Sequence, residues 1–189
     1  MKRPCLLLDR DGVLVEDMGY LRRVEDIRPI PGSFAAVARA RVAGFPVVVV
    51  TNQSGIGRGY YTEEIYRQVQ IAIETEMLES GAALDAVYFC PSAEDDHPDR
   101  KPNPGMLLRA ALEHQLDLAN SIMIGDKLRD LEAGVRAGVG WVCLVLTGEG
   151  AKDEPAVRAA DLRPAKSWVC RDLAEAVERW LEIPPRVRA

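Results

Sequence analysis

The sequence has no apolar run long enough for a secretion signal or a membrane span. Only residues 5–8 form an apolar run before Asp9, whereas a signal-peptide core has roughly 7 to 15 apolar residues. No later stretch reaches the roughly 18 residues that a membrane-spanning helix needs. We therefore expect a cytoplasmic protein with no membrane partner.

The chain also lacks a basic excess, sequence repeats and paired cysteines. Its formal charge of -5 and its lack of an aromatic stacking surface predict no nucleic-acid partner. The cysteines are widely spaced without a CxxC pair, and we expect reduced, mostly buried thiols: Cys5, Cys90, Cys143 and Cys170. At 189 residues the chain can bury a core without disulfides or structural metals. We predict a single domain over residues 1–189 and, because no strongly apolar exposed helix is evident, a monomer.

Strand-like and helix-like segments alternate along the chain. Short apolar runs bounded by polar residues and glycine are typical of strands buried on both faces of a parallel sheet; they lie at 5–8, 45–50, 86–90, 121–124 and 141–146. Helical patterns occupy 31–44, 62–77, 104–114, 128–137 and 171–181. This alternation predicts right-handed βαβ units and an α/β fold with a doubly wound, three-layer, Rossmann-like parallel sheet.

Two of these helices carry more specific predictions. In the first helix we expect core positions at Phe34, Val37 and Val42. Thr62 is a good N-cap for the next helix, because its hydroxyl can accept a hydrogen bond from a free backbone N–H of the first turn. The last residues, 184–189, are expected to be frayed.

Three of the predicted strands end in polar residues that could share one site. Asp9 and Asp11 follow the first run, Thr51 follows the second, and Asp126 follows the fourth. Parallel sheets bind ligands at the carboxyl ends of their strands, so we expect these side chains at one edge. Buried carboxylates are costly without a cation, and such an oxygen-rich set suits Mg²⁺. Asp130, one turn further on, is expected to orient a neighbour or a metal-bound water.

A phosphoryl group at this edge would need hydrogen-bond donors and positive charge. Thr51 supplies a hydroxyl, residues 55–57 supply accessible backbone N–H groups, and Lys101 supplies an ammonium. Each residue alone also fits an ordinary structural role: Asp9 and Asp11 as capping residues, Thr51 as a turn residue, and Lys101 as a solvated surface lysine. The argument for a phosphate site therefore depends on all of them together.

The order of these motifs resembles a known enzyme superfamily. DRDG, VVVVTNQSG, RKPNPGM and GDKLRD are similar to the four motifs of the haloacid dehalogenase (HAD) superfamily of aspartate-nucleophile phosphatases, over residues 5–148. DMGY, TNQSGIGRGYYT and RKPNPGMLL resemble most closely the D-glycero-D-manno-heptose 1,7-bisphosphate 7-phosphatases and the related histidinol phosphatases. The spacing between motifs leaves no room for an inserted cap domain, so the loops at 15–30 and 91–104 are expected to overhang the site.

The resemblance implies a Mg²⁺-dependent phosphomonoesterase that acts on a small phosphorylated sugar. It implies Asp9 as the nucleophile that forms an aspartyl-phosphate and Asp11 as the general acid and base. Thr51 and Lys101 would hold the phosphoryl oxygens. The Mg²⁺ ligands would be Asp9, the backbone carbonyl of Asp11, and Asp126. The remaining positions implied to bind substrate are Asp17, Met18, Gly19, Tyr20, Asn52, Gln53, Ser54, Arg100 and Lys127, with Arg100 discriminating because a guanidinium can bind a second phosphate or sugar hydroxyls.

The loop after Cys90 departs from the heptose phosphatases, which commonly carry a zinc site there. Ser92 stands where a histidine is usual, and no further cysteine precedes Arg100. Cys90 and His97 are too few for a closed tetrahedral zinc site, so we predict no structural zinc. Because this loop faces the leaving group, a histidinol phosphatase or another small sugar-phosphate phosphatase stays open as an alternative. A binding module without turnover is disfavoured by the presence of every catalytic motif.

Overall fold

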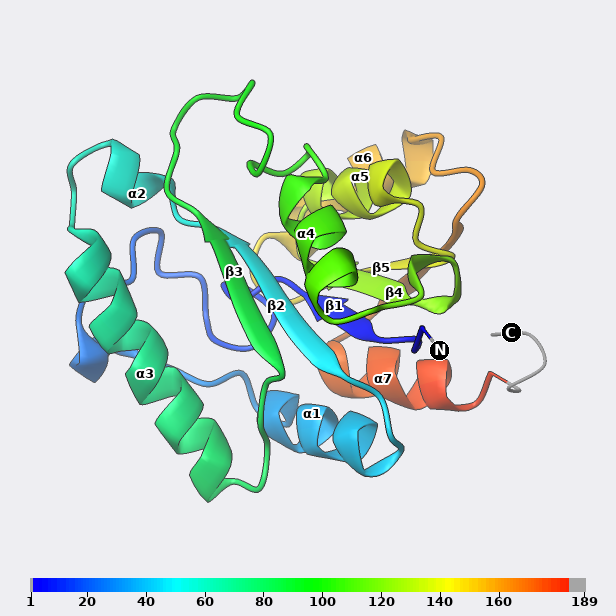
Figure 1. Ribbon diagram of the computed structural model, residues 1–189, viewed down its shortest axis with the longest axis horizontal. Helices are drawn as coiled ribbons and strands as arrows, with labels where there is room; N and C mark the ends of the chain where they lie inside the picture. The colour runs from blue at the N-terminus through cyan, green and yellow to red at the C-terminus, as the bar shows by residue number, and fades with distance from the viewer. Residues whose placement is uncertain (1, 184–189) are drawn as a thin grey trace.

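A parallel sheet of six strands forms the centre of the computed structural model, which describes residues 2–183 (Figure 1). The strands are β1 (Leu6–Leu8), β2 (Val47–Asn52), β3 (Ala86–Cys90), β4 (Ile122–Gly125), β5 (Trp141–Val145) and β6 (Lys166–Cys170). Their order across the sheet is β3-β2-β1-β4-β5-β6. The chain therefore builds outward from β1 in one direction and from β4 in the other. The point between β1 and β4 is where such sheets bind ligands.

Helices cover both faces of the sheet (Figure 1). One core cluster joins the sheet to α1 (Ser33–Val42), α3 (Glu63–Glu79) and α7 (Leu173–Leu181). The second joins it to α4 (Gly105–Glu113), α5 (Leu128–Ala137) and α6 (Gly150–Ala159). In β1, Leu6 and Leu8 enter the first cluster and Leu7 the second, because successive strand residues point to opposite faces. The predicted doubly wound, three-layer fold is confirmed.

Short elements and loops lie between these layers. They include α2 (Ser54–Gly57), which follows β2, and two 3-10 turns, η1 (Val24–Asp26) and η2 (Leu118–Asn120). Within residues 2–183 no further domain is inserted between the strands, as the motif spacing predicted. No helix in that range is long and apolar enough to cross a membrane.

Most local predictions agree with the structure. The five predicted strands and five predicted helices are present, and the Thr62 hydroxyl accepts a hydrogen bond from the Ile65 N–H at 3.3 Å. The four cysteines are buried and form no disulfide. Phe34 and Val37 lie in the core, but the prediction for Val42 is wrong, because its side chain is 91% exposed in the last turn of α1. The prediction for 184–189 lies outside the described residues.

Two elements, α6 and β6, were not predicted from the sequence. Helix α6 has Pro155 in its interior and no clear apolar stripe. Strand β6 lies at the edge of the sheet, and its first two residues, Lys166 and Ser167, are exposed. An edge strand needs no continuous apolar run, since one side of it faces water.

Candidate active site

Three acidic side chains meet where the sheet changes direction. Asp9 follows β1 and Asp126 follows β4, and the Asp9 N–H donates to the Ile124 carbonyl at 2.9 Å. Asp130 lies in the first turn of α5. One oxygen from each of the three carboxylates lies within 4.8 Å of the others, and all three residues are buried. Burial together with Asp9 and Asp130 raises the pKa of Asp126, because three desolvated negative charges repel one another.

This cluster fits a divalent cation. Oδ2 of Asp126 accepts a hydrogen bond from the Glu149 N–H at 2.9 Å, whereas its buried Oδ1 has no partner among the described residues. A buried carboxylate oxygen without a donor is costly, and carboxylate oxygens are the ligands that Mg²⁺ and Ca²⁺ prefer. The oxygens of Asp130 are engaged by Lys101 and by the Lys127 N–H. Asp9 and Asp126 are therefore the carboxylates best placed to hold a metal, and Asp130 orients its neighbours.

Gly12 gives the cluster its space. Its φ is +81°, in the left-handed region that favours glycine, and an added Cβ would lie 2.2 Å from Oδ2 of Asp126. The glycine of DRDG is therefore required by both the turn and the carboxylate that follows β4.

Lys101 places a buried positive charge against the acids. Its Nζ lies 3.0 Å from Oδ1 of Asp9 and 2.8 Å from Oδ1 of Asp130. Burial alone would lower the pKa of Lys101, but Asp130 and Asp9 outweigh it and raise the pKa, so the ammonium stays charged. The Asn52 side chain fixes the backbone of this lysine, with its amide donating to the Lys101 carbonyl and its oxygen accepting from the Lys101 N–H, both at 3.0 Å.

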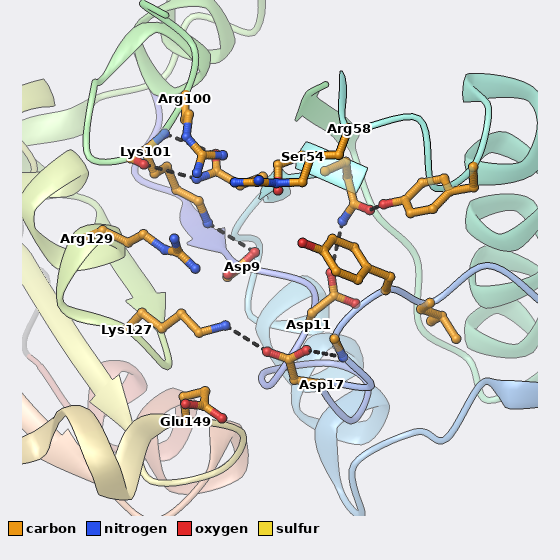
Figure 2. Close-up of a pocket in the computed structure, with 16 residues that line it drawn as sticks. Asp9, Asp11, Asp17, Ser54, Arg58, Arg100, Lys101, Lys127, Arg129 and Glu149 are labelled. Carbon is orange, nitrogen blue, oxygen red and sulfur yellow. Dashed lines mark hydrogen bonds and ion pairs between the residues drawn. The ribbon is translucent and has the colours of Figure 1, made fainter. Parts of the chain in front are cut away.

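Asp11 is held on the opposite wall by Arg10 and Gln53. The buried guanidinium of Arg10 donates to both Asp11 oxygens at 2.9 Å. Nε2 of Gln53 donates to Oδ2 of Asp11 and to Oγ1 of Thr51, each at 2.9 Å, and the Tyr61 hydroxyl donates to Oε1 of Gln53 at 2.8 Å. This network orients the Asp11 carboxylate, which lines the pocket (Figure 2).

A pocket of about 360 Å³ opens above these groups (Figure 2). Eleven of the sequence-predicted site residues line it: Asp9, Asp11, Asp17, Gly19, Tyr20, Asn52, Gln53, Ser54, Arg100, Lys101 and Lys127. Thr51 and Asp126 are buried and are not among the lining residues, and Met18, whose side chain is 54% exposed, is not among them either. Lys127 reaches across to Asp17, with Nζ 2.7 Å from Oδ2, which joins α5 to the loop after β1.

Sequence reasoning missed several residues that line this pocket, chiefly Arg58, Arg129, Tyr61 and Glu149. Arg58 follows the short helix α2, and Arg129 lies two residues after Lys127. A lone arginine in a loop or on a helix has no spacing that separates it from a solvated surface charge. Its position close to the motifs is the one signal that could have found it.

The loop at 91–104 is held by hydrogen bonds and ion pairs. Nε of Arg100 lies 3.0 Å from Oδ1 of Asp95, and the Asn103 amide donates to the carbonyls of Asp95 and His97 at 3.0 Å each. Sγ of Cys90 lies 3.5 Å from Nδ1 of His97. The same ring nitrogen accepts a hydrogen bond from the Asp99 N–H at 3.2 Å, which makes it a member of the loop's own hydrogen-bond network.

The parallel sheet, with acids at the ends of β1 and β4, defines the class of haloacid dehalogenase-like hydrolases. A family model described as haloacid dehalogenase-like hydrolase matches residues 6–91, and a HAD-hydrolase-like model matches residues 99–176. D-glycero-D-manno-heptose-1,7-bisphosphate 7-phosphatase of Thermosynechococcus vestitus is 39% identical over 92% of this chain and 99% of its own length. D-glycero-beta-D-manno-heptose-1,7-bisphosphate 7-phosphatase of Escherichia coli K12 is 38% identical over 91% of each chain.

The solved structures agree with the sequence relatives. The D,D-heptose 1,7-bisphosphate phosphatase from B. bronchiseptica, complexed with magnesium and phosphate, superposes with a TM-score of 0.86 at 35% identity and covers 97% of this chain and 100% of that chain. The chain therefore belongs to the family of heptose-bisphosphate phosphatases within the haloacid dehalogenase-like hydrolases. It is a phosphatase.

Proposed function

We propose that this phosphatase removes the C7 phosphate from a heptose 1,7-bisphosphate and leaves the anomeric phosphate in place. The observation that carries the proposal is the position of Asp9, whose carboxylate lies at the metal-binding cluster and 3.0 Å from the buried ammonium of Lys101. The names of the relatives supply the substrate class. The pocket volume of about 360 Å³ lies in the range of small-molecule sites.

The metal in this proposal is Mg²⁺, held by the carboxylates of Asp9 and Asp126 and the backbone carbonyl of Asp11. When bound, it shields the dianionic phosphate from the anionic nucleophile. Lys101 contributes the second positive charge, and Asp130 keeps that ammonium aimed at Asp9. No structural zinc is part of the proposal, since Cys90 and His97 supply two ligands of the four that a closed zinc site needs.

In the first half-reaction an oxygen of the Asp9 carboxylate attacks phosphorus. The new O–P bond forms as the bond between phosphorus and the C7 oxygen breaks, which leaves an aspartyl-phosphate. Asp11, entering in its protonated form, donates its proton to the departing sugar oxygen. Thr51 and Lys101 hold the phosphoryl oxygens as negative charge develops on them.

In the second half-reaction Asp11 acts as the base. It takes a proton from a water molecule whose oxygen attacks phosphorus, and the bond between phosphorus and Asp9 breaks. Inorganic phosphate leaves, and the Asp9 carboxylate and the protonated Asp11 are restored. The hydrogen bonds from Arg10 and Gln53 keep Asp11 oriented through both steps.

The sugar is proposed to lie between two walls of the pocket. Asp17 to Tyr20 form one wall, tied to α5 by the Lys127–Asp17 ion pair. Asn52 to Ser54 and Arg100 form the other. We further propose a cytoplasmic monomer with a single domain, whose partner is this small phosphorylated sugar.

Phosphate release from heptose 1,7-bisphosphate tests the proposal. Both anomers are assayed with Mg²⁺ beside histidinol phosphate and simple sugar phosphates at matched concentrations. We expect kcat/KM to be highest for one heptose bisphosphate anomer. A higher kcat/KM for histidinol phosphate would overturn the assigned substrate, and the Asp9 chemistry would then serve a different leaving group.

A further inference from the structure

Five positively charged side chains line the pocket, and they differ in whether a carboxylate neutralises them. Lys101 is paired with Asp9 and Asp130, and Lys127 is paired with Asp17. Arg58 and Arg129 also line the pocket, and no carboxylate within residues 2–183 forms an ion pair with either of them. Two uncompensated charges in one pocket are a feature that an anionic ligand would relieve.

Arg129 belongs to the reacting end of the pocket. It lies in the first turn of α5, between Lys127 and Asp130. In Figure 2 its guanidinium points into the pocket from the side of Lys101 and Lys127, toward Asp9. Burial raises the pKa of Asp130, and Arg129 is among the cations that oppose this rise. Any phosphate ester bound at Asp9 would therefore feel its charge.

Arg58 lies at a different place, beside Arg100. Its neighbour Gly57 donates from its N–H to the Pro91 carbonyl at 2.9 Å, and an added Cβ at Gly57 would lie 2.7 Å from that oxygen. Nη1 of Arg100 donates to the next carbonyl, that of Ser92, at 3.2 Å. The two arginines thus flank the same piece of backbone. Figure 2 shows the Arg58 side chain extending across the pocket toward Arg100.

The partner of Arg100 is easily replaced. The Asp95 side chain, 3.0 Å from Nε of Arg100, is 94% exposed, and an exposed ion pair contributes little net stability. A dianionic phosphate offers three oxygens to two guanidinium forks, which bind such groups through paired, charge-assisted hydrogen bonds. The Arg58 and Arg100 pair therefore has the charge and donor geometry for one phosphate monoester, separate from the one at Asp9.

We infer that Arg58 binds, together with Arg100, the phosphate that the enzyme leaves on its substrate. This inference rests on the proposed function for the identity of the sugar, but the chemistry it requires is general: a second phosphate monoester on the molecule whose first phosphate reacts at Asp9. Arg58 is then a specificity-determining residue for bisphosphates.

The test compares Arg58→Gln with the unmodified enzyme on heptose 1,7-bisphosphate and heptose 7-phosphate. Losing a charge-assisted contact should lower the ratio of kcat/KM for the bisphosphate over the monophosphate by about 10- to 100-fold, mainly through KM. Arg58→Lys should restore part of the ratio. Arg129→Gln is the control within the pocket, and it should lower both values together. Arg22→Gln, an exposed arginine away from the pocket lining, should change neither.

A second set of probes keeps this inference separate from the choice of sugar. Alkanediyl bisphosphates of increasing length, and the matching alkyl monophosphates, are measured as competitive inhibitors of p-nitrophenyl phosphate hydrolysis. Tighter inhibition by a bisphosphate, lost in Arg58→Gln, supports the inference even if heptose bisphosphate is not hydrolysed. Equal inhibition by both classes in the unmodified enzyme, or an equal loss for both in Arg58→Gln, overturns it.

Discussion

Replacing Asp130 by Asn removes one negative charge from the buried cluster while keeping the shape of the side chain. Asp130 accepts from two donors, the Lys101 ammonium at 2.8 Å through Oδ1 and the Lys127 N–H at 3.0 Å through Oδ2. An amide has one accepting oxygen and one donating nitrogen. In either orientation of the introduced amide its nitrogen would face a donor, so one of the two contacts is lost and becomes repulsive.

The expected loss of stability follows from these contacts. Breaking a buried ion pair costs about 3 to 5 kcal/mol, but Asp9 remains within 3.0 Å of Lys101 and one fewer carboxylate crowds the cluster. We therefore expect the free energy of unfolding to fall by about 2 to 3 kcal/mol. For a chain of this size that lowers the melting temperature by roughly 4 to 12 °C. Because Lys101 loses its second anchor, kcat should also fall by about 10- to 100-fold.

Asp153→Asn is the matched control for this change. Oδ2 of Asp153 accepts from the Leu128 N–H at 2.8 Å, at the N-terminus of the same helix α5. Asn caps helices as well as Asp does, so this variant should unfold close to the unmodified protein. Thermal unfolding followed by circular dichroism measures both variants, and phosphate release measures kcat. If Asp130→Asn lost no more stability and activity than Asp153→Asn, the buried pair would not be what positions Lys101.

Three further predictions concern the same site. Gly12→Ala should lower kcat/KM by about 100-fold or more, because the new Cβ would displace the Asp126 carboxylate; a Mg²⁺ titration of activity should show weaker metal binding in parallel. Removing divalent cations with a chelator should abolish phosphate release. Burial beside other carboxylates raises the pKa of Asp126, so the metal-free folded state keeps a proton that the unfolded chain releases near pH 4. Its free energy of unfolding, measured in urea, should therefore fall as pH rises above about 4, and Asp126→Asn should weaken that dependence; a rise over this range would contradict the assigned environment. Arg10→Met should cost about 2 to 3 kcal/mol and lower kcat, because the Asp11 carboxylate loses its buried partner; unchanged kcat would mean that Gln53 alone orients Asp11.

The sequence was most informative where burial and chemistry leave a periodic or repeated pattern. Residues 86–90 and 128–137 were predicted with the same boundaries that β3 and α5 have, because a short apolar run is typical of a buried strand and an apolar stripe at helical spacing is typical of a helix. The edge strand β6 and the Pro-containing helix α6 have neither feature. Val42 satisfies the helical period but falls at the end of α1, where its side chain is exposed.

The candidate site divides in the same way. Asp9, Asp11 and Asp126 could be predicted as neighbours because all follow strands of one parallel sheet. The partners that control them were less accessible: Arg10 is one residue from both Asp9 and Asp11, yet nothing in its position alone says that it is buried and bound to Asp11. Arg58 depends on how α2 packs against the Pro91 backbone, a contact between segments far apart in sequence. Such contacts come from tertiary packing and leave no local pattern.

The central claim is that Asp9 carries the phosphoryl group during turnover. A single turnover with substrate and Mg²⁺, quenched in acid and followed by peptide mass analysis, measures this directly. We expect one phosphoryl group on the peptide that contains Asp9, increased in Asp11→Asn, in which the water is no longer deprotonated, and absent in Asp9→Asn. Phosphate release by Asp9→Asn at the rate of the unmodified enzyme, with no phosphorylated peptide in either protein, would contradict the account.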